Sequence, residues 1–484
     1  MKKDVLPTVK TMSKRHRPIT KPVLAFSVGA PFLWMYIVAR YLKVTGPIAQ
    51  STKELPIVKN EIVMDALPSK ITISSTQLSD NETFQPINDD NSWVYSAYYD
   101  VMSPKLTMIR VIGIATRTNH TVFCLLNKDG YTRTNIGNRV FLLEDHAKNY
   151  TATMFECVVE KNFKPTSISI TYKPDDTPTN LLEIQYPKQR ERNFTVCYPA
   201  LFGYNNISRI IQAIEINRVL GAQHFFIYNY SISREMDAVL RHYQDEGVLT
   251  VLQWPLPLDD VMHVWYYGQM SAINDCVYRN KFVSQYVVIQ DPDEFIIPNH
   301  HMTWSDLIEA AEREYQSKHK VKARPLGSFT FESAFFNTLS NSTLWEQIKK
   351  NFSITTEEEN FFQHNKIFPY LHVRRHKNVL KSPIRSKTIV RPEYISYSGI
   401  HVTFQHRDDA NFITVSQNLS IVHHYRDDMV LSSSRIDTSA LRFKDNTLPL
   451  LRRAYTMFVN ETRLSGSQIG ESSSSGSKIR GSRF

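Results

Sequence analysis

Three carboxylates follow directly on one short apolar segment of the chain. Residues 284–295 read Ser-Gln-Tyr-Val-Val-Ile-Gln-Asp-Pro-Asp-Glu-Phe, which places Asp291, Asp293 and Glu294 after a β-branched apolar run. Such a run predicts a strand buried on both faces, and ligands of open α/β sheets gather outside the carboxyl ends of strands. An Asp-x-Asp in that place suits a hard divalent cation whose other ligands are phosphate oxygens, whereas the alternative interpretation is a polar turn.

The elements that position these carboxylates follow an alternating pattern. Strands are predicted at 194–198, where Pro199 ends the strand, at 223–230 and at 248–254, and helices at 207–220, at 233–246 and from near 266 to 280. The first helix has apolar residues three to four positions apart and Gly221 after its end, and the second opens on a Ser233 cap. Strands that alternate with helices of this length indicate right-handed β-α-β units. We therefore predict an α/β domain with a mostly parallel sheet over residues 193–463.

A second, smaller domain precedes the α/β domain. Apolar runs at 106–114, 121–126 and 154–159 are separated by Gly, Asn, Asp and Pro clusters, which predicts short strands and a β-rich domain over residues 91–192. Residues 43–90 are rich in Ser, Thr, Asp, Asn and Pro with little periodicity, as in an extended stem. The Gly- and Ser-rich residues 464–484 are predicted to be a disordered tail.

An uncharged segment near the N-terminus predicts a membrane anchor. Residues 22–39 contain no charged side chain, and as a helix they rise roughly 27 Å, enough for a thin bilayer. Seven Lys or Arg precede the segment, against Arg40 and Lys43 close behind it, which makes residues 1–21 a cytosolic tail. We therefore predict a transmembrane signal anchor over residues 22–42 with the rest of the chain in the lumen. The alternative is a cleaved signal peptide, whose charged leading segment would be unusually long.

The remaining composition agrees with a secretory location. The net charge of +10 is concentrated at the two ends of the chain, so we expect no basic nucleic-acid-binding face and no nucleic-acid partner. Four cysteines allow two disulfides with three connectivities, or buried free thiols, for which Cys276 on an apolar helix is the best candidate. Ten N-glycosylation sequons are spread along the body, at Asn81, Asn119, Asn149, Asn193, Asn206, Asn229, Asn341, Asn351, Asn418 and Asn460.

Several further motifs occur in a fixed order along the chain. They are Ser-Ala-Tyr-Tyr-Asp (96–100), Glu215, Leu-Gly-Ala-Gln-His-Phe-Phe-Ile-Tyr-Asn (220–229), Gly-Gln-Met-Ser-Ala-Ile-Asn-Asp-Cys-Val-Tyr-Arg (268–279), Asp-Pro-Asp-Glu-Phe-Ile-Ile-Pro (291–298), Ser-Lys-Thr-Ile-Val-Arg-Pro-Glu (386–393), Gly-Ile-His (399–401) and His-His-Tyr-Arg (423–426). Each motif is loose alone, but their order and spacing resemble glycosyltransferase family 92, which is abundant in nematodes. The resemblance covers most of residues 93–460.

The resemblance implies a GT-A-type nucleotide-sugar-binding fold, a Golgi location with single-pass type II topology, and an inverting sugar transfer. Characterised members of the family that this chain resembles transfer galactose from a UDP-sugar to a fucose residue of a glycan, and they form a β linkage. The expected function is therefore metal-dependent inverting transfer of a hexose, galactose by preference, from a UDP-sugar to a glycan or glycoprotein acceptor, with Mn²⁺ as the expected cation. One departure is Pro292, where the family commonly has an apolar residue. Proline stiffens the turn and removes a backbone donor, which leaves the detailed ligand geometry open.

In this interpretation the acidic run binds the cation that bridges the two phosphates of the donor. We expect Asp293 to be the most direct ligand, Asp291 to bind through water or to hold the donor ribose, and Glu294 to orient its neighbours. A further metal ligand is expected from His401 or His424, with His424 preferred, although a lone His near a strand is more often structural.

Four further residues have predicted roles outside the acidic run. Lys387 and Arg391 are candidates to reach the donor diphosphate, with a solvated basic loop as the alternative. Asp275, on the helix before the acidic strand, is a candidate to hydrogen-bond the donor, or else belongs to a helix surface with one internal cap or pair. Glu332 interrupts an apolar aromatic run and is the predicted base for the acceptor hydroxyl, with a structural Glu paired to an Arg as the alternative.

The residues leave two other function classes open. The first is a catalytically inactive protein that uses the same fold to bind a glycan. The second is a glycoside hydrolase, which needs two carboxylates that flank a sugar. Turnover of a nucleotide sugar distinguishes the transferase from both.

Overall fold

A computed structural model describes residues 83–466, apart from several short gaps. The gaps are residues 89–90, 104–105, 259–262, 320–323, 338–341, 427–428 and 430–432. All described residues belong to one of the two units into which the chain divides, residues 75–484. The predicted cytosolic tail, the membrane anchor at 22–42 and most of the predicted stem and C-terminal tail lie outside the described residues. Within the described part, no helix combines the length and the apolar character that crossing a bilayer requires.

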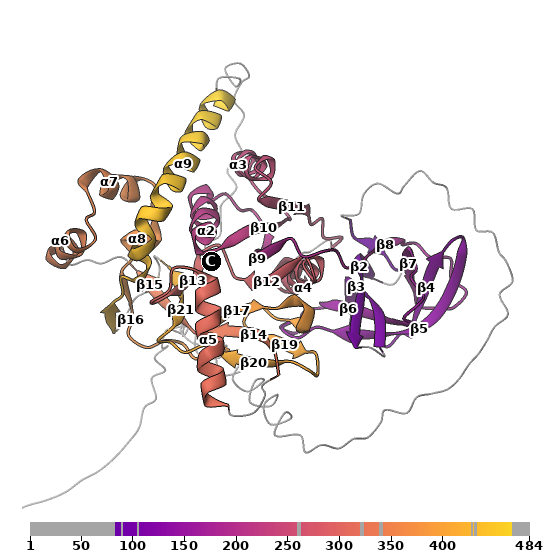
Figure 1. The fold of residues 1–484 in the computed structure, drawn as a ribbon. Coiled ribbons are helices and arrows are strands. Elements are labelled where there is room, and N and C mark those ends of the chain that lie inside the picture. The colour runs from indigo at the N-terminus through magenta and orange to yellow at the C-terminus, as the bar shows by residue number, and fades with distance from the viewer. Residues whose placement is uncertain are drawn as a thin grey trace, which may run out of the picture. The chain divides into compact units, whose positions relative to one another are not determined.

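The first part of the described chain is a closed, mostly antiparallel sheet (Figure 1). Its strands lie in the order β1-β2-β3-β6-β5-β4-β7-β8, and β8 pairs with β2 to close it. They are β1 (Gln85–Pro86), β2 (Ser92–Ser103), β3 (Leu106–Thr116), β4 (Val122–Lys128), β5 (Tyr131–Phe141), β6 (Tyr150–Val159), β7 (Ser167–Thr171) and β8 (Leu182–Gln185). Alternate residues of these strands, such as Ile109 and Val111, form one buried core. Ile87 joins this core and β1 pairs with β2, so the sheet begins in the last residues of the predicted stem.

The strand–helix half is built around a seven-stranded sheet in the order β11-β10-β9-β12-β17-β14-β20. Its strands are β9 (Arg192–Leu201), β10 (Ala222–Asn229), β11 (Leu249–Gln253), β12 (Ser284–Ile289), β14 (Leu326–Phe331), β17 (Lys387–Val390) and β20 (Asn411–Thr414). Every strand except β17 runs in the same direction, so the sheet is mixed with parallel strands predominating, as predicted. Helices α2 (Ile207–Leu220), α3 (Arg234–Asp245) and α4 (Gln269–Arg279) connect the first four strands along the chain and bury their apolar faces against the sheet.

In the strand–helix half, two element boundaries differ from the sequence-based prediction by three residues, each for a local reason. Strand β9 continues through Pro199 to Leu201, because a one-residue bulge interrupts the ladder there and no proline N–H is needed. Helix α4 starts at Gln269 rather than near residue 266, because Tyr266 and Tyr267 take left-handed backbone conformations with φ of 46° and 56°. Bulky residues rarely adopt that conformation unless their surroundings hold them in it.

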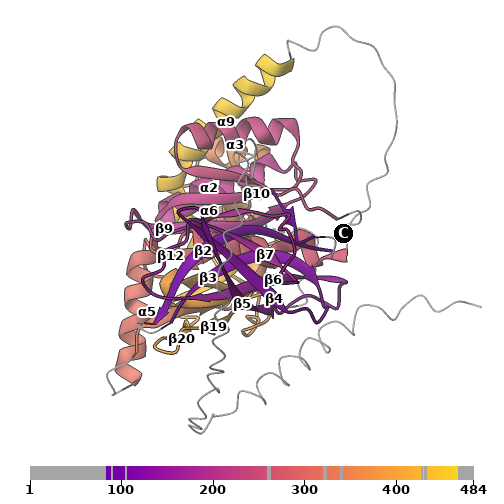
Figure 2. The same cartoon turned by 90° about the vertical axis from the view of Figure 1, so that its right-hand side faces the viewer.

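A second, five-stranded sheet has the order β13-β21-β15-β16-β22. Its strands are β13 (Glu294–Pro298), β15 (Ser333–Asn337), β16 (Arg374–His376), β21 (Ser420–Tyr425) and β22 (Ser434–Ile436). The remaining elements are α5 (Trp304–Lys318), α6 (Ser342–Asn351), α7 (Thr356–His364), α8 (Phe368–Leu371), β18 (Ile395–Ser398), β19 (Thr403–His406), α9 (Lys444–Gly466) and the 3₁₀ turns η2 (Trp265–Gly268), η3 (Pro392–Tyr394) and η4 (Ser439–Phe443). Helix α9 packs along α2 and α3 (Figures 1 and 2). The chain passes from β12 in the first sheet to β13 in the second through residues 290–293, so the acidic run lies where the two sheets connect.

Two disulfides join elements that are distant in sequence. Cys124–Cys157 links β4 to β6 across the intervening strand β5, and Cys197–Cys276 links β9 to α4, each with Cα atoms 6.1 Å apart. No cysteine of the described chain is free. The prediction of two disulfides is therefore confirmed, and the alternative that Cys276 is a free thiol is wrong, because α4 packs against β9 and brings Cys276 to Cys197.

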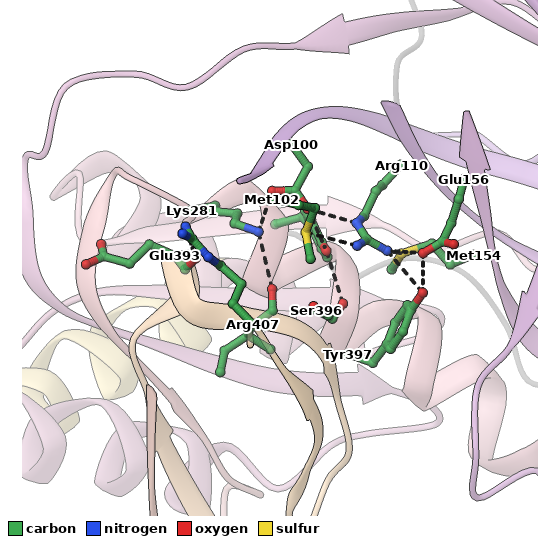
Figure 3. A network of polar contacts seen from close by, with 12 residues as sticks. Asp100, Met102, Arg110, Met154, Glu156, Lys281, Glu393, Ser396, Tyr397 and Arg407 are labelled. Carbon is green, nitrogen blue, oxygen red and sulfur yellow. Dashed lines mark hydrogen bonds and ion pairs between the residues drawn. The ribbon is translucent and has the colours of Figure 1, made fainter. Parts of the chain in front are cut away.

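A buried polar network joins the β-rich domain to the strand–helix half (Figure 3). We call it the junction network. The β-rich domain contributes Asp100, Arg110 and Glu156, and the strand–helix half contributes Lys281 and Tyr397. Nε of Arg110 lies 2.8 Å from Oδ2 of Asp100, and Nζ of Lys281 lies 2.6 Å from Oδ1. Arg110 also pairs with Glu156, to which the Tyr397 hydroxyl donates a hydrogen bond. Burial alone would raise the pKa of Asp100, but Lys281 and Arg110 hold it below its ordinary value.

Candidate active site

Five side chains meet where β12 ends, and we call them the strand-tip cluster: Asp291, Asp293, Glu294, Lys387 and His424. Asp291 and Asp293 lie in the turn after β12, and Glu294 begins β13. The antiparallel register of β12 with β17 places Lys387 beside the end of β12, and that of β13 with β21 places His424 opposite Glu294. Strand pairing therefore gathers residues from three distant parts of the sequence.

Lys387 is the buried counter-charge of two of the carboxylates. Its Nζ lies 2.6 Å from Oδ2 of Asp291 and 2.8 Å from Oε2 of Glu294, and its side chain is wholly buried. Burial alone would lower the pKa of Lys387, but the two carboxylates raise it far above its ordinary value. Burial would raise the pKa of Glu294, but Lys387 and His424 hold it well below its usual range. Lys387 thus lies inside the cluster instead of in a solvated loop, and its contact with a diphosphate stays a prediction.

His424 connects the other two carboxylates. Its Nδ1 lies 3.0 Å from Oε1 of Glu294, and its Nε2 lies 3.5 Å from Oδ2 of Asp293. Burial lowers the pKa of an imidazole, but Glu294 and Asp293 raise that of His424 to about 9, so the ring is protonated at neutral pH. Arg209 of α2 also approaches Asp293, with Nη1 2.9 Å from Oδ2. The chain's own cations therefore balance the carboxylates of the cluster.

The three carboxylates differ in how far they face solvent. The side chains of Asp291 and Asp293 are 28% and 21% exposed, whereas that of Glu294 is 2% exposed. Among the described residues, no group of three or more His, Cys, Asp or Glu side chains is arranged to hold a metal ion by itself. Two outward carboxylates nevertheless fit a cation that takes its other ligands from a diphosphate and water. The Glu294–His424 pair matches the arrangement in which a carboxylate orients a metal-binding imidazole.

Two tyrosines and one arginine that no sequence pattern singled out border the cluster. The charges of Asp291 and Asp293 act on both Tyr204 and Tyr266, and burial, as the larger cause, raises the pKa of each phenol. Tyr266 is 50% exposed and has the left-handed backbone described above. Its only sequence signal is the aromatic triplet before Gly268, and Arg209 has none, because one cation on a helix is unremarkable until its neighbours are known.

Asp275 and Arg391 lie away from the strand-tip cluster. Asp275 is wholly buried and accepts hydrogen bonds of 2.6 Å from the hydroxyls of Tyr98 and Tyr228. Arg391 follows the far end of β17, where its Nη2 lies 2.8 Å from Oε1 of Glu312. Asp275 is therefore buried and not on the helix surface, but it does form the internal pair of the alternative interpretation, with Nε of Arg279 2.6 Å from its Oδ2. The structure brings neither Asp275 nor Arg391 to the cluster.

His401 and Glu332 are also engaged with other partners. Nδ1 of His401 lies 3.0 Å from the carbonyl oxygen of Ser386, and burial, aided by the charge of Lys387, lowers the pKa of His401 to about 3. Glu332 is buried, and its Oε2 lies 3.2 Å from Nζ of Lys381. His401 is thus a neutral imidazole whose Nδ1 contacts the backbone carbonyl of Ser386. Glu332 pairs with a lysine, whereas the alternative interpretation expected an arginine. Their roles as metal ligand and base stay predictions.

A cavity of about 250 Å³ lies elsewhere in the molecule, where the β-rich domain meets the strand–helix half. Its walls include Tyr98, Tyr186, Arg192 and Lys281, and no member of the strand-tip cluster lines it. This cavity and the candidate chemistry therefore lie in different places, and the candidate site is chosen by the chemistry of its side chains.

Comparison with known proteins agrees with the sequence motifs. A family model described as glycosyltransferase family 92 matches residues 192–457. The β-1,4-galactosyltransferase galt-1 of Caenorhabditis elegans is 25% identical over 357 residues, which are 70% of this chain and 75% of that protein. The galactan β-1,4-galactosyltransferase GALS2 of Arabidopsis thaliana is 24% identical over 172 residues, which are 35% of this chain and 32% of that protein.

Solved structures overlap with this one only weakly. S. aureus TarS in complex with UDP-GlcNAc is 12% identical with a TM-score of 0.26, over 49% of this chain and 60% of that chain. Glucosyl-3-phosphoglycerate synthase from Mycobacterium tuberculosis, in a complex that includes Mn²⁺ and UDP, is 9% identical with a TM-score of 0.21, over 42% and 58%. Overlaps of this size support no inference about fold or ligands.

Proposed function

Because the chain belongs to glycosyltransferase family 92 and is thus a glycosyltransferase, we propose that it transfers a hexose, galactose by preference, from a UDP-sugar to a glycan or glycoprotein acceptor. In this proposal the transfer requires a divalent cation, with Mn²⁺ expected, inverts the anomeric configuration and takes place on a GT-A-type fold. The observation that carries the proposal is the pair of outward carboxylates, Asp291 and Asp293, at the end of a central strand.

The preference for galactose rests on the relatives. Two proteins of different kingdoms that resemble this chain are both named as β-1,4-galactosyltransferases, one from a nematode and one from a plant. Because both names specify transfer of galactose, UDP-galactose is the first donor to test. The acceptor class, a glycan or a glycoprotein, follows from the family and not from a pocket in this chain.

The strand-tip cluster supplies groups of the right kind for a nucleotide sugar. Asp291 and Asp293 would hold the cation, and Nε2 of His424 could join them only after the ring loses its proton to the incoming cation, with Glu294 on the Nδ1 side. A bound cation stabilises the negative charge that develops on the departing diphosphate. Arg209, which is partly exposed and pairs with Asp293, would exchange that partner for a diphosphate oxygen.

The proposed location is the Golgi membrane, with residues 22–42 as a type II anchor and the described residues in the lumen. The uncharged segment 22–39 and the sequons of the body support this topology. The two disulfides support it as well, because such bonds form and persist in the secretory pathway.

A donor screen of the full chain in detergent micelles tests the proposed function. UDP-galactose, UDP-glucose, UDP-N-acetylglucosamine and GDP-fucose are each supplied with either Mn²⁺ or EDTA, with and without a fucosylated glycan acceptor. We expect nucleotide release to be fastest with UDP-galactose, to increase with the acceptor and to cease in EDTA. NMR of the product reports the anomeric configuration.

The other function classes predict different results in the same screen. A glycan-binding protein without turnover would retain the acceptor and release nucleotide from no donor. A glycoside hydrolase would release sugar from the glycan with no donor present. Either result would contradict the proposal that the protein is an active transferase.

A further inference from the structure

A loop of the β-rich domain, residues 142–149 between β5 and β6, reaches the strand–helix half next to the strand-tip cluster. The ring of His146 stacks on that of Trp265, with centroids 3.6 Å apart. The next residue, Tyr266, lies within electrostatic range of the acidic residues of the cluster. The loop is therefore attached to the same turn that borders the cluster.

Glu144 is the carboxylate that this loop carries toward the cluster. The backbone N–H of Ile400 hydrogen-bonds the Glu144 carboxylate, and Lys387 lies near enough to attract it electrostatically. Its Oε2 is shielded and has no hydrogen-bond partner among the described residues, while the side chain as a whole stays partly exposed. A shielded carboxylate oxygen without a partner costs free energy, so its presence calls for an explanation other than stability.

The backbone of the loop fixes the direction of this side chain. Glu144, His146 and Ala147 have φ of 66°, 50° and 56°, a region that residues other than glycine seldom occupy. Such conformations persist where the surroundings determine them, and they concentrate at functional sites. Asp145 supplies part of that restraint, because it pairs with Arg117 and accepts a hydrogen bond from the backbone N–H of Ala147.

We propose that Glu144 is the catalytic base of the transfer reaction, so that the β-rich domain supplies a reacting group to the active site of the other half. This inference rests on the proposed function, because it assigns a residue to that reaction. Lys387 contacts Asp291 and Glu294 directly and also attracts Glu144. Glu144 thus shares the electrostatic environment of the cation site and remains separate from its carboxylates.

The step deprotonates the acceptor in line with the departing diphosphate. Glu144 accepts the proton of the acceptor hydroxyl while the hydroxyl oxygen forms a bond to the anomeric carbon. The bond from that carbon to the diphosphate oxygen breaks, the diphosphate keeps the electron pair, and the proton later passes from Glu144 to solvent. Burial, opposed by the Ile400 hydrogen bond and by Lys387, raises the pKa of Glu144 to about 7, which suits a base that works near neutral pH.

Glu332, the base predicted from the sequence, is less available than Glu144. Its Oε2 contacts Lys381 and accepts a hydrogen bond from Gln417, and its Oε1 accepts one from the backbone N–H of Ser382. Both oxygens of Glu332 are therefore engaged, whereas Glu144 keeps one oxygen without a partner in the described chain.

Glu144→Gln in the full chain tests the inference. With UDP-galactose and acceptor we expect kcat to fall by about 10²- to 10⁴-fold, the usual range for loss of a general base. Affinity for UDP and the melting temperature should stay unchanged, because the cluster is intact. The matched control is Glu160→Gln in the same domain, an exposed carboxylate whose partner is Arg133, and it should retain full activity.

The pH profile separates a base from a structural group. Wild-type kcat should fall as the pH drops below about 7. In Glu144→Gln this acid limb should move to lower pH, where Asp291, whose pKa burial raises to about 6, still titrates. Of the charged groups around Glu144, Lys387 titrates far higher, Asp145 is paired with Arg117, and burial lowers the pKa of His146. If the Gln variant disturbs the loop, Glu144→Ala with added formate decides the question, since a small carboxylate restores activity only where a carboxylate base is missing.

The outcomes distinguish this inference from the proposed function. If the wild type transfers sugar and Glu144→Gln keeps more than a tenth of the activity with the same pH profile, the inference is overturned and the proposed function stands. Loss of transfer in Glu332→Gln with full activity in Glu144→Gln would return the base role to Glu332. A wild type that turns over no donor overturns the proposed function itself.

Discussion

The junction network and the strand-tip cluster use the same kinds of residue and differ in what covers them. Both set carboxylates against cationic side chains, with ion pairs of 2.6–2.9 Å. In the junction network Asp100, Arg110 and Lys281 are 0%, 2% and 4% exposed. In the strand-tip cluster Asp291 and Asp293 are 28% and 21% exposed. Ion pairing therefore does not distinguish the two groups, whereas solvent exposure distinguishes Asp291 and Asp293 from Asp100.

The physical reason lies in desolvation. A buried charge that loses its partner is strongly unfavourable, so the members of the junction network depend on one another for stability. An outward carboxylate keeps contact with water and can exchange a partner of the chain for a ligand at smaller cost. The two groups should therefore respond differently to the same substitution, and the following predictions use that difference.

Asp100→Asn should have the largest effect, on folding. The change leaves Lys281 buried without its counter-charge and Arg110 with Glu156 alone, which costs about 3–5 kcal/mol of unfolding free energy. Urea unfolding at pH 7 measures the loss, and kcat per folded molecule should remain within about twofold of wild type. A loss below about 1 kcal/mol would mean that the junction network contributes little to the stability of the fold.

Asp293→Asn should have the converse effect, on catalysis. We expect kcat to fall by about 10²- to 10³-fold, which corresponds to about 2.7–4 kcal/mol of transition-state stabilisation. The unfolding free energy should change by less than about 1 kcal/mol, because the side chain is partly exposed. Steady-state kinetics together with urea unfolding check both parts, and an unfolded or fully active variant would contradict the comparison.

Ligand binding should stabilise the protein through one cluster only. Mn²⁺ with UDP at about 100 times the dissociation constant should add about 2.7 kcal/mol to the unfolding free energy, and EDTA should remove this gain. The gain should persist in Asp100→Asn and disappear in Asp293→Asn. Thermal melts with and without EDTA measure it, and an equal gain in both variants would place the cation elsewhere.

Acid should weaken the junction network by a smaller amount. The folded pKa of Asp100 lies below the unfolded value of 3.8, so its contribution is present above pH 3.8 and is lost as the pH falls through the folded pKa. The unfolding free energy should decrease by at most about 1.4 kcal/mol per pH unit from this group. Asp100→Asn should lack that part of the slope. If the unfolding free energy of the wild type and of Asp100→Asn decreased equally with pH below pH 4, Asp100 would not be the cause of the decrease.

Elements that depend on one segment were predictable from the sequence. Helix α2 has the bounds 207–220 that its apolar spacing indicates, and Ser233 caps α3 by accepting a hydrogen bond from the backbone N–H of Met236. The acidic run follows a buried strand, as its composition predicts. In each case the physical cause lies within a few residues of the effect.

Contacts that depend on strand register were not predictable. His424 lies opposite Glu294 because β21 pairs with β13, and Lys387 reaches the cluster because β17 enters a parallel sheet in the opposite direction. Arg209 and Glu144 come from a helix and from the other domain, where no local pattern marks them. The pairing of Cys276 with Cys197 depends in the same way on how α4 packs against β9.

The position of Lys281 limits how the two halves of the protein can be recombined with other domains. Its ammonium group is buried in the strand–helix half, and its carboxylate partner Asp100 belongs to the other domain. A gene rearrangement that moved either half alone would carry an ionic group without its partner into the new protein. Either half, if moved alone, should therefore need a compensating change at Asp100 or Lys281.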